Sequence, residues 1–120
     1  MLIPENIKSL SAYDIGQLLY KKKVCPIDLV NFYYNEIKLF TKPSPYTVLS
    51  KDRALIEARD SKKRLTENSP LSPLDGVPVA WKDLFNMKGF VTTGGSKLLE
   101  NNEAAKKDAH VVSLAKKAGL

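Results

Sequence analysis

The sequence is poor in the residues that build disulfides and metal centres. Its 120 residues include one cysteine, Cys25, and one histidine, His110. A single cysteine excludes an internal disulfide and suits a reducing compartment, so we expect a cytoplasmic location. One histidine excludes a metal site made of several histidines, and the acidic residues do not have metal-ligand spacing. The sequence therefore predicts neither a metal nor a cofactor.

Long apolar runs and phosphate-binding loops are also missing. No apolar stretch approaches the roughly 18–20 residues of a membrane helix. The N-terminal residues 1–6 do not combine a basic segment with an apolar core, so no signal peptide is evident. No glycine-rich loop of the Walker or dinucleotide type is present. We expect a globular protein without a membrane partner.

The positive charge is dispersed along the chain. The net charge is +6, which by itself suggests nucleic-acid binding. The cations, however, fall near the ends of predicted helices, where they complement the helix dipole and usually face solvent. Aromatic residues do not alternate with them, as a base-stacking surface would require. Nucleic acid is therefore not the expected partner.

Apolar periodicity and capping residues predict four helices. Ser11 and Ser50 stand at N-cap positions, Pro26 suits a first helical position, and Asp108 is expected to cap the last helix. Gly119 is a typical helix terminator. The predicted helices cover residues 11–22, 26–40, 51–68 and 108–118. A tyrosine-rich face of the second, residues 30–37, is interpreted as core packing, with a ligand site as the alternative.

Two apolar segments, 46–49 and 77–81, are predicted as strands. The second is wholly apolar, as a strand covered on both faces would be. Between it and Asp108 lies an irregular stretch, 83–106, of a length that tends to be functional or disordered. A strand followed by a helix normally leads to a further parallel strand. The fold class we predict is α/β, with helices packed on part of a mixed sheet.

The most informative segment is Pro73-Leu74-Asp75-Gly76-Val77-Pro78-Val79-Ala80-Trp81-Lys82-Asp83-Leu84. A turn leads into the apolar strand, which ends at Lys82. Open α/β sheets place their chemistry beyond the carboxyl ends of strands. Lys82 is therefore either a structural cation paired with a carboxylate or a base whose pKa burial lowers.

Three blocks in this order resemble the N-terminal part of the amidase signature enzymes. They are the 73–84 segment, the run Lys88-Gly89-Phe90-Val91-Thr92-Thr93-Gly94-Gly95-Ser96-Lys97, and Asp108-Ala109-His110-Val111-Val112 with Lys117-Ala118-Gly119. The resemblance extends from about residue 10 to residue 120. It implies a serine hydrolase that cleaves carboxamides. It also implies that residues 1–120 are a partial amidase domain, truncated before a Gly/Ser-rich catalytic segment.

The family mechanism uses a nucleophilic serine, a second serine in a cis peptide, and a lysine as base. By resemblance Lys82 is that catalytic lysine, and both serines lie outside this sequence. Ser96 is read as a turn or helix cap rather than as the nucleophile. Asp83 is expected to point away from Lys82 and to accept hydrogen bonds from loop backbone. We therefore expect the chain alone to be inactive.

The substrate implied by the resemblance is a small carboxamide bound by the complete enzyme, and the implied partner is a complementing C-terminal chain. Two alternatives remain open. One is a non-catalytic remnant or interaction module. The other is the N-terminal part of a glutamyl-tRNA(Gln) amidotransferase A subunit, which belongs to the same family.

Overall fold

The structure, a computed structural model, describes residues 2–40 and 44–120. These ranges contain the α-helices α1 (Ala12–Tyr20), α2 (Pro26–Lys38), α3 (Lys51–Thr66) and α4 (His110–Lys117). Two single 3₁₀ turns, η1 (Ile7–Ser9) and η2 (Lys97–Leu99), complete the regular structure there. All four predicted helices are present, each ending slightly earlier than the sequence predicted.

The helix starts follow the sequence at three of the four predicted positions. Ser11 is the N-cap of α1, where its hydroxyl accepts a hydrogen bond from the Asp14 N–H at 3.1 Å. Pro26 opens α2, and Ser50 precedes α3 without a side-chain capping bond. The prediction that Asp108 caps α4 is wrong, because Ala109 occupies that position. The Asp108 carboxylate is engaged by a guanidinium group instead.

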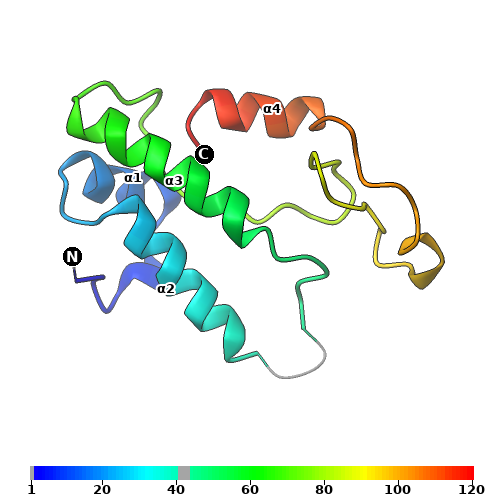
Figure 1. The fold of residues 1–120 in the computed structure, drawn as a ribbon. Coiled ribbons are helices and arrows are strands. Elements are labelled where there is room, and N and C mark those ends of the chain that lie inside the picture. The colour runs from blue at the N-terminus through cyan, green and yellow to red at the C-terminus, as the bar shows by residue number, and fades with distance from the viewer. Residues whose placement is uncertain (1, 41–43) are drawn as a thin grey trace.

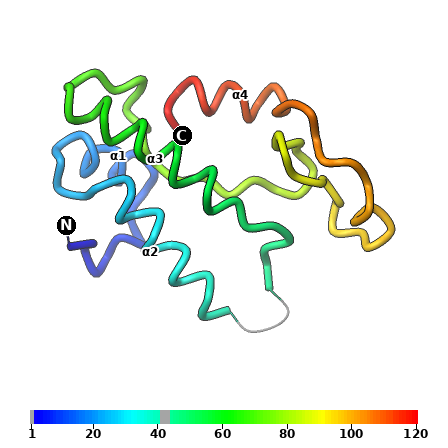
Figure 2. The backbone as a smooth tube through the Cα atoms, viewed as in Figure 1, coloured from blue at the N-terminus to red at the C-terminus, as the bar shows by residue number. Residues whose placement is uncertain are grey.

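Helix α3 lies in the middle of the molecule, with α2 along one side and α4 on the other (Figures 1 and 2). The main core lies where α1, α2 and the C-terminal part of α3 meet. Close packing there extends to the backbone: a Cβ added to Gly16 of α1 would lie 2.0 Å from the Pro73 carbonyl oxygen. The buried core residues are Ile7, Ile15, Leu19, Val24, Leu29, Leu65 and Val77.

Neither predicted strand forms among the described residues. Segments 46–49 and 77–81 carry no strand assignment, so the predicted mixed sheet is not seen in residues 2–40 and 44–120. The physical reason is that a strand exists only as one member of a hydrogen-bonded pair. Backbone N–H groups from Val79 to Asp83 make no hydrogen bond in the described parts of the chain.

The stretch between this segment and α4 is irregular, as the sequence predicted, apart from the turn η2. It extends away from the helices as a long loop (Figure 2). Two backbone hydrogen bonds of 2.9 Å, from Gly89 to Ala105 and from Ala105 to Phe90, hold its two arms together. The Ala109 N–H donates to the Asn86 carbonyl at 2.8 Å, which fixes the start of α4 to the beginning of the loop.

Candidate active site

The turn that leads to the candidate lysine is fixed by a buried carboxylate. Asp75 is only 2% exposed, and both of its oxygens accept hydrogen bonds from the Arg64 guanidinium of α3 at 2.8 Å. A further bond of 2.9 Å comes from the Leu71 N–H. Burial pushes the pKa of Asp75 upward, but the bonds from Arg64 and Leu71 outweigh it, so this pKa lies below its usual value. Arg64 thereby anchors residues 73–84, the motif segment, to α3.

The residue after Asp75 must be glycine for two reasons. Gly76 has a φ of +88°, a backbone conformation that strains residues with a side chain. A Cβ at this position would also lie 2.5 Å from the buried Ser61 hydroxyl oxygen. The Leu-Asp-Gly turn is thus determined by close packing against α3.

Lys82 lies at the end of the 77–82 segment, where the chain turns. Its carbonyl oxygen accepts hydrogen bonds from the N–H groups of Leu84 at 2.6 Å and Phe85 at 3.2 Å. Its side chain is exposed, and its amine makes no hydrogen bond or ion pair within residues 2–40 and 44–120. The structural-cation interpretation required a carboxylate partner, and the described residues supply none. The role of Lys82 as base stays a prediction.

Asp83 points to the loop, as expected. Its carboxylate accepts a hydrogen bond from the Thr93 N–H at 2.9 Å and another from the Thr93 hydroxyl. These bonds lower the pKa of Asp83. Among the described residues the Asp83 carboxylate is therefore bound by the loop and forms no ion pair with Lys82. The Gly95 N–H also donates to the Asp83 carboxylate at 3.4 Å, so the Gly94–Gly95 turn is held beside Asp83.

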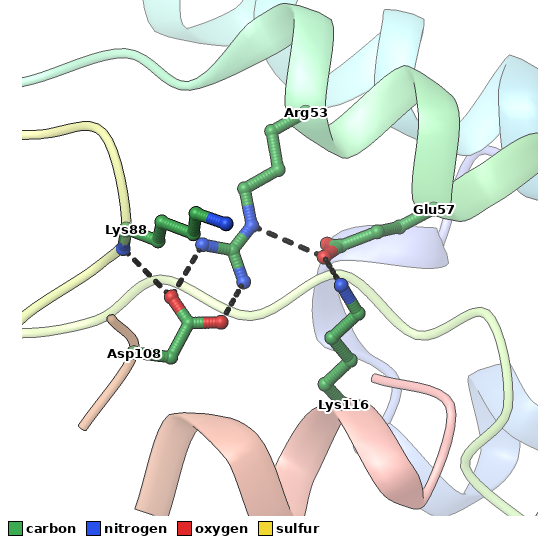
Figure 3. A network of polar contacts seen from close by, with 5 residues as sticks. All are labelled: Arg53, Glu57, Lys88, Asp108 and Lys116. Carbon is green, nitrogen blue, oxygen red and sulfur yellow. Dashed lines mark hydrogen bonds and ion pairs between the residues drawn. The ribbon is translucent and has the colours of Figure 1, made fainter. Parts of the chain in front are cut away.

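Sequence reasoning missed an ion-pair network that joins α3, the long loop and α4 (Figure 3). The Arg53 guanidinium donates to both oxygens of Asp108 at 2.7 and 2.8 Å, and the Lys88 N–H donates to the same carboxylate at 2.7 Å. Arg53 also bonds Glu57 at 3.1 Å, and Lys116 lies 3.6 Å from that glutamate. The bonds with Arg53 lower the pKa of Asp108. Nothing in the spacing of these residues indicates a contact across 55 positions.

A cavity of about 720 Å³ lies beside the candidate lysine segment. Its walls come from α2, α3, α4 and residues 76–83. The tyrosine-rich face of α2, predicted as core, lines this space through Tyr33 and Tyr34, which are only partly buried. The helices therefore leave one side of the motif segment uncovered.

No described contact joins Lys82 to the other residues that the sequence analysis considered, namely Ser96, His110 and Cys25. Ser96 is the N-cap of η2, which agrees with its predicted role in a turn. His110 is exposed at the start of α4, and Cys25 is buried at the start of α2. The part of the chain that the structure describes contains no group of three or more residues able to hold a metal ion. None of its helices is both long and apolar enough to cross a membrane.

The site thus combines a glycine turn anchored to α3, an apolar segment that ends in lysine, and a loop that is bound by the next aspartate. A family model described as Amidase matches residues 28–120. The chain belongs to the amidase family, as its resemblance to amidase signature enzymes predicted.

Two curated relatives are both named as the A subunit of glutamyl-tRNA(Gln) amidotransferase. The protein of Desulforamulus reducens is 34% identical over 97 residues, which cover 80% of this chain and 20% of the relative. That of Aromatoleum aromaticum is 34% identical over 110 residues, covering 91% of this chain and 22% of the relative. This chain thus spans about a fifth of the length of these relatives.

A solved structure agrees with the fold at a TM-score of 0.85 and 27% identity. The alignment covers 92% of this chain and 24% of the other one. That structure is described as an unexpected vestigial protein complex that reveals the evolutionary origins of an s-triazine catabolic enzyme. A second structure of that complex, with an inhibitor bound, matches at a TM-score of 0.84.

Proposed function

We propose that this chain supplies the general base, Lys82, to an amidase that hydrolyses small linear carboxamides. The observation that carries the proposal is the family match over residues 28–120, together with the position of Lys82 at the end of the motif segment. The hydrogen bonds of Asp83 to Thr93 support it, because they keep the neighbouring carboxylate away from the lysine. The nucleophilic serine and the cis-peptide serine come from the remainder of the amidase domain.

Lys82 requires that remainder in order to act as a base. A lysine has an ordinary pKa near 10.4 and is charged at neutral pH, so it accepts a proton only when desolvation favours the neutral amine. Lys82 is exposed among the described residues. The remaining amidase domain would exclude water from the amine and complete the mixed sheet beside residues 77–81. It would do so as a complementing C-terminal chain, in a reducing, cytoplasmic setting that suits the single cysteine.

The proposal is tested by complementation. The chain is co-expressed with the part of the Desulforamulus reducens relative that follows its match to this chain. The purified complex is then assayed on a panel of small primary carboxamides. We expect hydrolysis by the complex and none by the chain alone, because loss of the nucleophile from a serine hydrolase costs about six orders of magnitude in kcat.

Two lysine variants make the test specific. Lys82→Met in the complex should lower kcat about 10²- to 10⁴-fold, the usual contribution of a general base. Lys88→Met is the matched control, since among the described residues only the backbone N–H of Lys88 is engaged and its side chain is exposed. Equal activity of the two variants would refute the role of Lys82. Labelling of the isolated chain by a fluorophosphonate would instead contradict the claim that the nucleophilic serine comes from the remainder of the domain.

A second candidate function is that of a non-catalytic component of a complex. It is favoured by the similarity to a chain of a complex described as vestigial. In that case the complex would form, and its activity would be the same with Lys82→Met as with Lys82.

A further inference from the structure

Positive charge is gathered on one face of the last two turns of α3. Arg59, Lys62 and Lys63 are exposed there, and their i, i+3, i+4 spacing places them side by side on the helix surface. Among the described residues, none of these three side chains makes a hydrogen bond or an ion pair. The acidic residues Asp60 and Glu67 stand seven positions apart and share a neighbouring face. The cations and the acids of this helix end are thus segregated.

The turn that follows α1 adds three exposed lysines to this face. The Lys22 amine donates to the Asn68 side-chain oxygen at 2.9 Å and to the Thr66 carbonyl at 3.3 Å. These bonds hold the turn beside the C-terminal end of α3 (Figure 1). In the described parts of the chain, the side chains on either side of Lys22 are not engaged. We call the combined surface the cationic face, and it consists of Lys21, Lys22, Lys23, Arg59, Lys62 and Lys63.

The cationic face lies away from the cavity and from the candidate lysine. With 3.6 residues per turn, Arg53 and Glu57 stand on the other side of α3 from Arg59 and Lys63. Arg53 and Glu57 line the cavity and form ion pairs with Asp108 and with α4. A ligand on the cationic face would therefore leave the cavity open for the rest of the amidase domain.

The composition of the face favours phosphate groups as its ligand. All its members but Arg59 are lysines, which bind phosphate as point charges, whereas bidentate recognition of carboxylates is the preference of arginine. Protein interfaces have an apolar or aromatic centre, and membrane-surface helices have an apolar face to insert. None of the six residues supplies either. A row of cations with no acid among them, in a chain of pI about 9.4, instead matches the charge pattern of a nucleic-acid-binding surface.

We propose that the cationic face binds the phosphate backbone of a nucleic acid without reading its sequence. The ammonium groups displace the counterions that surround the phosphates, and this release drives binding. Kd should lie at about 10⁻⁴–10⁻⁶ M at physiological salt, the range of non-specific complexes. Sequence analysis did not favour nucleic acid because the cations stand in separate runs, and the fold unites two of those runs. The inference goes beyond the proposed function and does not depend on it.

Salt-dependent binding of a labelled RNA tests the proposal on the 120-residue chain itself. Fluorescence anisotropy is measured with a single-stranded RNA of mixed sequence over a series of salt concentrations. The logarithm of the association constant should fall linearly with the logarithm of the salt concentration. We expect a slope of about −3 to −4, since each phosphate contact on a single strand contributes about −0.7. A second RNA of unrelated sequence should bind within about twofold of the first.

Two fourfold variants separate the face from the net charge. The face variant carries Lys21→Gln, Lys23→Gln, Lys62→Gln and Lys63→Gln. The control variant carries Lys88→Gln, Lys97→Gln, Lys106→Gln and Lys107→Gln, which are exposed lysines of the long loop. Both variants remove four positive charges from the net +6. We expect the face variant to bind at least about tenfold more weakly, with a slope of about −1.4, and the control to stay within about threefold of wild type.

Several results would overturn the proposal. Equal weakening by both variants would mean that net charge alone attracts the RNA. Absence of binding at low salt would exclude the ligand altogether. Competition by poly-glutamate as strong as that by unlabelled RNA would indicate an acidic protein, and tighter binding to phosphatidylserine vesicles would indicate a membrane surface. Circular dichroism shows whether the face variant keeps its helices. If it does not, the double variant Lys21→Gln/Lys23→Gln, which lies outside the helices, must still make the slope less negative by about 1.4, and an unchanged slope would refute the proposal.

Discussion

The guanidinium of Arg53 holds both carboxylate oxygens of Asp108, at 2.7 and 2.8 Å, across 55 residues of sequence. The side chains are 18% and 14% exposed, so the pair is largely sheltered from solvent. The same carboxylate receives the Lys88 N–H. Asp108 therefore connects α3, the long loop and the start of α4 (Figure 3).

We predict that Asp108→Asn loosens this junction. The amide keeps one acceptor but loses the charge and the bidentate geometry that match a guanidinium. The loss should amount to about 1–3 kcal/mol, the cost of leaving a sheltered charged partner poorly satisfied. It is measured as a lower urea midpoint of the helical circular dichroism signal.

Glu103→Gln is the control for this variant. Glu103 forms its ion pair with Lys106 at 3.7 Å, with both side chains almost fully exposed. Exposed pairs contribute little because water and salt screen them. A midpoint for Asp108→Asn that equals that of Glu103→Gln would show that the junction does not stabilise the fold.

Acid should destabilise the chain through Asp75. Its pKa is lowered in the folded state, so its ionised form contributes stability that is complete above the unfolded value, near 3.9. That contribution is lost as the pH falls through the folded pKa, which lies lower still. The urea midpoint should therefore decline as the pH falls below about 4.

Asp75→Asn should be less stable than wild type at neutral pH, by about 3 kcal/mol, because Arg64 loses its charged partner. It should also depend less on acid, since one titrating group is gone. The free energy of unfolding should change with pH less steeply in Asp75→Asn than in wild type, by up to about 1.4 kcal/mol per pH unit. Identical slopes in the acid range would contradict the assignment to Asp75, leaving Asp83 and Asp108 as the carboxylates with lowered pKa values.

Gly16→Ala should destabilise α1, although alanine in a helix is ordinarily better than glycine by about 1 kcal/mol. The added methyl carbon would meet the Pro73 carbonyl at 2.0 Å, so the helix or the loop before the motif must move. Overpacking of this kind typically costs about 1–3 kcal/mol. Gln17→Ala, one residue later in the same helix, should stay within about 0.5 kcal/mol of wild type. A Gly16→Ala variant that is more stable than wild type would show that this contact is not close in solution.

The isolated chain should bind a hydrophobic dye and melt without a sharp transition. Val79, Phe85 and Leu49 are exposed around the open cavity, and each large apolar side chain left in water forfeits up to about 1.5–3 kcal/mol. Domains are stable by only about 5–15 kcal/mol in total. Calorimetry and dye fluorescence provide the measurement. A single cooperative transition of a monomer with dispersed amide resonances would show that the chain is a self-sufficient domain.

Local signals made the helices predictable, and the lack of local signals limited the rest. The caps and apolar faces of α1, α2 and α3 depend on residues within one or two turns, so the sequence alone located them. The interpretation of Asp83 also succeeded, since its partners lie about ten residues away. No strand forms in residues 2–40 and 44–120, because pairing depends on a second segment, which the apolar composition of 77–81 cannot supply. The pairs Arg64–Asp75 and Arg53–Asp108 were missed because both arginines stand on charge-rich helices, where exposed cations are the ordinary expectation.

Cys25 gives this chain a built-in reporter. It is the only cysteine, it is 7% exposed, and it lies where the chain leaves α1 and enters α2. A thiol reagent reaches it only when that junction opens, so the alkylation rate measures how often the two helices separate. The opening rate of the N-terminal core can thus be measured in the unaltered protein, with and without a partner, and no label has to be introduced.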